Sequence, residues 1–129
     1  MRYLNLQEVQ TMHDDIIDEI GGLKGSNPKQ IALLDSVLTQ IQNDEYYPSF
    51  IDKLTHLVFA CVKFHPFSDG NKRTAIYIAK AFIIINYLDS LPLDFYQRLE
   101  DIIVGVANDS VSKEELTQIL SNILDYKSE

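Results

Sequence analysis

The fold of this chain is governed by residues 71–88, which read NKRTAIYIAKAFIIINYL. After a polar start, apolar residues fall on nearly every side of the helix that this stretch predicts, which is typical of a central, buried helix. The β-branched run Ile83-Ile84-Ile85 alone would also suit a strand. The alanine-rich beginning and the length of the stretch favour a helix, so we predict one from Asn71 to about Leu88.

Helical patterns continue on the N-terminal side of this stretch. Asn5 with Glu8 resembles a capping pair and predicts a first helix, which Gly21-Gly22 should end. Its inward face is expected to carry Val9, His13, Ile16 and Ile20. Pro28 suits the first turn of a second helix. The polar residues 43–49 predict an exposed connection to a third helix, which spans Ile51 to Val62.

The C-terminal side is also helical. An apolar stripe from Phe95 to Val106 predicts a fifth helix, and Ser112 with Glu115 forms a capping pair for a last one. The sequence contains no clear strand pair, no repeat and no linker. We therefore predict an all-α fold of about six helices around a central buried helix, in a single domain over residues 1–129.

Composition narrows the possible functions. Eleven basic and nineteen acidic residues give a net charge of −8, which argues against general nucleic-acid binding. The one cysteine, Cys61, cannot form an internal disulfide and is expected to be a small buried hydrophobe. The N-terminus does not resemble a signal peptide, and the most apolar stretch, residues 75–85, is too short to span a bilayer. We expect a cytoplasmic protein with no membrane contact.

The segment before the long helix, residues 65–73, reads HPFSDGNKR and has the features of a phosphate site. A helix N-terminus offers free N–H groups to an anion, and Gly70 and Asn71 could form a cradle there. Lys72 and Arg73 lie at the wrong end of the helix dipole, at a cost of about 0.3–1 kcal/mol each. A phosphate bound between them would turn this cost into attraction.

Two further residues of the segment could complete a catalytic site. Asp69 could hold Mg²⁺ together with substrate phosphates, although it could also simply cap the helix. His65 could take the proton of an attacking hydroxyl. For His13 and His56 we expect structural roles, His56 in a surface pair with Asp52 one helical turn away.

The ordered run from His65 to Thr74 closely resembles the signature of the Fic/Doc family. Within this family it is most like the Doc, or death-on-curing, toxins of toxin–antitoxin modules. Lys72 stands where AMP-transferring Fic enzymes usually have a glycine, and Ile76 where they have a second arginine. A looser likeness covers most of the chain, including Gly21-Gly22-Leu23 and the helix start at Ser112.

The resemblance implies a protein kinase that moves the terminal phosphate of ATP to a Thr or Ser hydroxyl of a translation factor, elongation factor Tu being the expected target. By position, His65 would be the base and Asp69 the Mg²⁺ ligand. Gly70 and Asn71 would form the anion cradle, and Lys72 and Arg73 would contact phosphate. The connection over residues 43–49 is expected to hold the target segment by backbone pairing.

Two other functions stay open at this point. The first is Fic-type AMP transfer to a protein hydroxyl, and the second is a non-catalytic binding module with the same fold. The chain lacks the Ser/Thr-x-x-x-Glu-Gly/Asn motif of the inhibitory helix found in many Fic proteins. We therefore expect control by an external, Phd-like antitoxin.

Overall fold

The computed structural model describes residues 1–87 and 91–128 and confirms the all-α prediction. Leu88, to which we extended the long helix, lies outside the described residues. No helix within them is both long and apolar enough to cross a membrane. The described helices are α1 (Leu6–Ile20), α2 (Pro28–Gln40), α3 (Phe50–Phe64), α4 (Asn71–Tyr87), α5 (Phe95–Ala107) and α6 (Lys113–Ser128).

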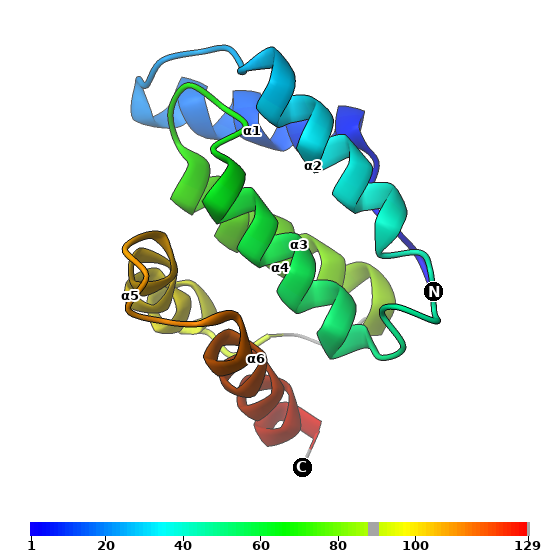
Figure 1. The fold of residues 1–129 in the computed structure, drawn as a ribbon. Helices are drawn as coiled ribbons and strands as arrows, with labels where there is room; N and C mark the ends of the chain where they lie inside the picture. The colour runs from blue at the N-terminus through cyan, green and yellow to red at the C-terminus, as the bar shows by residue number, and fades with distance from the viewer. Residues whose placement is uncertain (88–90, 129) are drawn as a thin grey trace.

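Two antiparallel helices, α3 and α4, form the centre of the molecule. Helices α1 and α2 cover one side of this pair, and α5 and α6 cover the other (Figure 1). The long helix α4 is therefore central, as predicted, but it shares this position with α3. It is not buried on every side, because Tyr77 and Ile84 are exposed.

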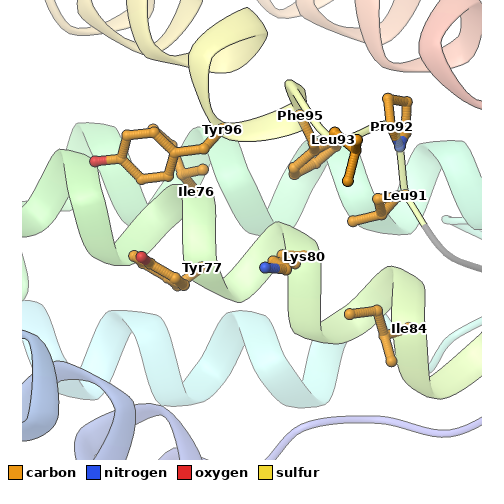
Figure 2. Close-up of a pocket in the computed structure, with 9 residues that line it drawn as sticks. All are labelled: Ile76, Tyr77, Lys80, Ile84, Leu91, Pro92, Leu93, Phe95 and Tyr96. Atoms are coloured by element: carbon orange, nitrogen blue, oxygen red, sulfur yellow. The ribbon is translucent and has the colours of Figure 1, made fainter.

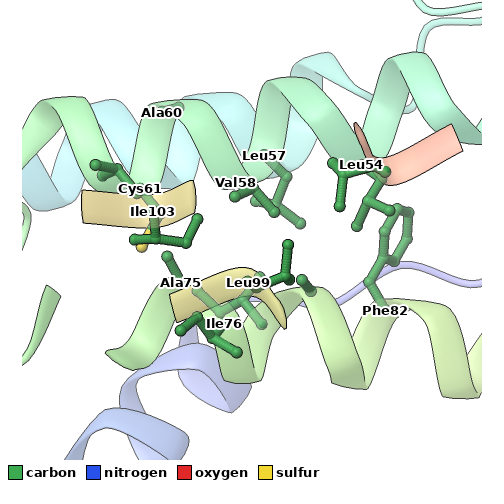
Figure 3. Close-up of a cluster of buried hydrophobic side chains, with 14 of the residues drawn as sticks. Leu54, Leu57, Val58, Ala60, Cys61, Ala75, Ile76, Phe82, Leu99 and Ile103 are labelled. Atoms are coloured by element: carbon green, nitrogen blue, oxygen red, sulfur yellow. The ribbon is translucent and has the colours of Figure 1, made fainter. Parts of the chain in front are cut away.

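The core fills the space between the central pair and its neighbours. Leu54 of α3 lies beside Phe82 of α4, and Ile103 of α5 lies beside Cys61 of α3 in the same cluster (Figure 3). Cys61 is fully buried in this cluster, and burial raises the pKa of its thiol to about 12. Cys61 is thus a packing residue, as expected from the sequence, and not a nucleophile.

The capping signals of the sequence act as predicted. Asn5 and Glu8 form a reciprocal capping box at the start of α1, and Ser112 and Glu115 exchange the same two bonds before α6. Gly21 ends α1 in the left-handed conformation. The expected inward face of α1 was partly wrong, since Ile20 is 40% exposed whereas Ile17 is buried.

The predicted surface pair of His56 and Asp52 is also wrong. Asp52 accepts the backbone N–H of Ser49 and caps α3 instead. The His56 ring stacks on Tyr47, lies 3.4 Å from Gln40 Oε1 and accepts a hydrogen bond from Lys113 Nζ at 3.0 Å through Nδ1. His56 therefore joins α2, α3 and α6.

His56 should make stability depend on pH. Burial, helped by the charge of Lys113, lowers its pKa from 6.5 to about 4. As pH falls from 6.5 to about 4, His56 takes up a proton in the unfolded chain but not in the folded one, so the free energy of unfolding decreases. We expect a loss of about 1–2 kcal/mol, discounted for partial exposure of the ring.

Urea unfolding of wild type and His56→Gln at several pH values from 6.5 to about 4 measures this effect. Subtracting the free energy of unfolding of His56→Gln from that of wild type cancels the contribution of the carboxylates, which the two proteins share. This difference should shrink as pH falls. A difference that stays constant over this range would contradict the assignment.

Candidate active site

The predicted site lies in the loop that joins α3 to α4. Pro66 disfavours helical geometry at the residue before it, and α3 ends at Phe64. His65 then adopts a left-handed conformation, with φ 48° and ψ 58°. Pro66 and Phe67 are buried, whereas His65 is exposed. The loop is thus anchored in the core by its second and third residues and presents its first, His65, to solvent.

The side chain of Asn71 holds this loop closed. Its Oδ1 accepts the N–H of Phe67 at 3.0 Å, and its Nδ2 donates to the carbonyl of Phe67 at 2.9 Å. These bonds fix the orientation of the amide, so Nδ2 faces His65 Nδ1 at 3.4 Å. A contact of this length is too weak to fix which ring nitrogen carries the proton. The buried Asn71 side chain serves the loop, and only its backbone N–H remains for an anion.

The first turn of α4 presents donors and positive charge. The backbone N–H groups of Asn71, Lys72 and Arg73 have no acceptor within the described part of the chain. The side chains of Lys72 and Arg73 are exposed and make no ion pair with any described residue. This is the arrangement that binds an anionic phosphate.

Asp69 does not cap α4, contrary to the simpler alternative. Its Oδ1 accepts the N–H of Gly70 at 2.8 Å, and its Oδ2 accepts the N–H of Leu23 at 3.1 Å. Each carboxylate oxygen keeps a further lone pair. One oriented carboxylate suits Mg²⁺, which is usually held by one or two carboxylates together with substrate phosphates. The described residues contain no cluster of three or more ligands that could hold a metal without such phosphates.

The segment that links α1 to α2 lies beside the loop. Ser26 and Phe67 form an isolated antiparallel bridge. Asn27 N–H donates to the Pro66 carbonyl at 2.9 Å, and Ser68 N–H donates to the Gly25 carbonyl at 3.1 Å. Residues 25–27 thus run as a short extended segment along residues 66–68.

Residues 43–49, which we expected at the site, lie elsewhere. They form an exposed connection, as predicted, but they precede the start of α3, whereas the loop follows its end (Figure 1). The 15 residues of α3 separate the two by about 22 Å. The segment that borders the site is therefore 22–27.

His13 is a buried, hydrogen-bonded residue, as expected, but its contact with the loop was not predicted from the sequence. Its side chain is 1% exposed, and its ring stacks on Phe67 with centroids 3.8 Å apart. Its Nε2 lies 2.7 Å from the Asp69 carbonyl, 56 residues away in the sequence. A lone histidine on the apolar face of a helix looks like any core residue, so no local signal marks this contact.

Comparison with known proteins agrees with this geometry. The family model described as "Fic/DOC family" matches residues 3–83, which include α1 to α3, the loop and most of α4. The chain belongs to the Fic/DOC family. It is also 30% identical over 125 residues to "Protein kinase doc" of Escherichia phage P1, which covers 95% of this chain and 96% of that protein. These matches support the Doc branch and a protein-modifying transferase.

The role of Asn71 in the loop can be tested by replacing it with alanine. Asn71→Ala leaves the buried N–H and carbonyl of Phe67 without partners, which should lower the free energy of unfolding by about 1–3 kcal/mol. ATP affinity, measured by calorimetry, should fall as well, because the loop no longer holds the start of α4.

Asn86→Ala is the matched control. Asn86 also makes several bonds to the backbone, with Arg2 and Phe82, but far along α4 from the loop. It should leave ATP affinity unchanged. Equal ATP affinity for Asn71→Ala and wild type would contradict the proposed role of Asn71.

Proposed function

We propose that this protein is the toxin of a toxin–antitoxin module, a Doc-like kinase that phosphorylates a Thr or Ser of a translation factor. Elongation factor Tu is the expected target. The observation that carries the proposal is the loop itself: His65, Asp69 and the cationic start of α4 lie within residues 65–73, and the Asn71 side chain holds this loop closed. The match to a protein kinase over nearly the whole chain supports it.

ATP is expected to bind with its phosphates at the N-terminus of α4. The free N–H groups of Asn71, Lys72 and Arg73 and the side chains of Lys72 and Arg73 would supply the contacts. The N–H of Gly70 donates to Asp69 Oδ1, so Gly70 would contribute to the cradle by the close approach that a residue without a side chain allows. Asp69 would hold Mg²⁺, which neutralises charge on the phosphates when bound.

His65 would act as the general base. The hydroxyl oxygen of the target attacks the γ-phosphorus while the bond from that phosphorus to the β–γ bridging oxygen breaks, and ADP leaves with the electron pair. The hydroxyl proton moves to Nε2 of His65, which has no partner among the described residues. This step requires the tautomer with its hydrogen on Nδ1, so the ring must turn away from Asn71 Nδ2, which faces Nδ1 at 3.4 Å and can only donate.

Two positions favour phosphate transfer over AMP transfer. Lys72 stands in the first turn of α4 where AMP-transferring enzymes usually have a glycine, and we expect its long side chain to crowd a nucleotide bound in the orientation that those enzymes use. Ile76 stands where AMP-transferring Fic enzymes have a second arginine, and it is 2% exposed and packs in the core. Fic-type AMP transfer remains the alternative activity.

The target segment is expected to bind along residues 22–26. This segment already pairs on one side with the loop, through Gly25 and the Ser26 bridge. Leu23 is 68% exposed beside Asp69. An extended target chain could pair with the free side of the segment, which would bring its hydroxyl close to His65.

An antitoxin is the expected regulator of this protein. An apolar groove of about 320 Å³ runs between α4 and residues 91–96, with Ile84, Leu93 and Tyr96 among its walls (Figure 2). Tyr77 and Leu93 leave apolar surface exposed along it, as a docking site for an apolar segment requires. We further propose that residues 1–129 act as one domain in the cytoplasm, where translation takes place.

Intact-mass spectrometry of elongation factor Tu after incubation with this protein and Mg²⁺-ATP tests the proposed activity. A gain of about 80 Da, one phosphate, is expected with wild type. His65→Ala should give no gain, because the base is lost. A gain of about 329 Da would show AMP transfer instead, and full activity of His65→Ala would rule out the general-base role.

Lys72→Gly tests the reason for preferring phosphate transfer. We expect the rate of phosphate transfer to fall about 100-fold, the usual loss when one charge-stabilising group is removed. Arg98→Gly, which removes an exposed cation from α5, is the control and should keep the wild-type rate. An unchanged rate and product for Lys72→Gly would remove the argument for a kinase.

A further inference from the structure

Helix α1 packs closely against the peptide that joins Asp69 to Gly70. His13 Nε2 lies 2.7 Å from the Asp69 carbonyl oxygen, which can only accept, so Nε2 carries a hydrogen and donates it. Stacking on Phe67, with the two rings only 8° from parallel, holds the imidazole in this position. A buried, oriented donor of this kind does more than fill space in the core.

The hydrogen bond from His13 orients the carboxylate of Asp69 through the peptide group that joins Asp69 to Gly70. The Asp69 carbonyl and the Gly70 N–H belong to one rigid planar unit. His13 holds the carbonyl end of this unit, and the N–H end donates to Asp69 Oδ1 at 2.8 Å. Fixing the carbonyl therefore also fixes the donor that orients one carboxylate oxygen.

Gly22 leaves room for the other carboxylate oxygen of Asp69, Oδ2. A Cβ atom at Gly22 would lie 2.7 Å from Asp69 Oδ2, closer than Cβ atoms come to other atoms, and a tight 3.1 Å from Ile17 Cδ1. The absence of a side chain lets the backbone come close enough for the next residue, Leu23, to donate its N–H to Oδ2 at 3.1 Å. A larger residue at position 22 would push Asp69 away from this donor.

We propose that His13 and Gly22 are positioning residues that aim the Asp69 carboxylate at a divalent cation bound with the nucleotide phosphates. This inference rests on the proposed function, because it assumes that Asp69 holds the metal. Neither residue contacts the phosphates in this scheme. Their loss should weaken the contribution of the cation to ATP binding and leave the contribution of Lys72 and Arg73 intact.

Calorimetric titration of ATP, in Mg²⁺ and in EDTA, separates these contributions. The ratio of the two dissociation constants is the metal-dependent gain in affinity, and it requires no activity measurement. Wild type should show a gain that Asp69→Asn abolishes. His13→Phe keeps an aromatic ring on Phe67 but loses the donor, and should reduce the gain about tenfold with ATP affinity in EDTA unchanged. Gly22→Ala should behave in the same way.

Two further variants serve as rescue and control. His13→Gln places an N–H donor near the position of Nε2 and should recover most of the gain. His56→Phe also replaces a histidine stacked on an aromatic ring, on α3 about two and a half turns before His65, and should keep the wild-type gain. Thermal unfolding checks that each variant is folded.

The outcomes separate this inference from the proposed function. If His13→Phe keeps the wild-type gain, or loses affinity equally in EDTA and Mg²⁺, the positioning role is wrong while the kinase proposal stands. If wild type binds ATP with no gain from Mg²⁺, or does not bind ATP, the proposed function fails and this inference fails with it.

Discussion

The site depends on the two hydrogen bonds between the Asn71 side chain and the backbone of Phe67. They close the loop at the point where α4 begins, and they satisfy two backbone groups that the core would otherwise leave buried and unpaired. Phe67 can then lie in the core while His65 faces solvent. The same residue therefore fixes both the anchored part of the loop and the position of the exposed histidine.

The start of α4 carries charges that oppose its own stability. Lys72 and Arg73 face the positive end of the helix dipole without an acidic partner among the described residues. The acid nearest to them in sequence, Asp69, accepts hydrogen bonds from the backbone of Gly70 and Leu23 and forms no ion pair with them. Such an arrangement makes sense where a bound anion balances the charge, and a chain with net charge −8 has little other reason to gather bare cations there.

The features that the sequence predicts correctly are those that depend on local interactions. The caps at Asn5 and Ser112 and the break at Pro66 each depend on residues within a few positions of one another. The residues of the loop were likewise predicted together because they are contiguous in the sequence. The inward face of α1 was misjudged because periodicity alone does not distinguish Ile17 from Ile20 near a helix end.

Errors arose where contacts join distant parts of the chain. The pairing of His56 with Asp52 looked plausible on one helix, yet Lys113 from α6 is the actual partner. The resemblance to the Fic/Doc family suggested residues 43–49 as the segment that holds the target, although the helix predicted from Ile51 to Val62 already separates them from the loop. The contact of His13 with Asp69 spans 56 residues, and its signal exists only in the folded chain.

The backbone bonds between residues 25–27 and 66–68 have a consequence for local opening. With the Asn27 amide on the His65 carbonyl, 38 residues away, they tie the two sides of the site into one short ladder. Neither side can fray alone without breaking the same bonds, so their amide protons should exchange with solvent as one cooperative unit. Helices α2 and α3 lie between the two segments in the sequence, so they are part of a ring of chain that these hydrogen bonds close.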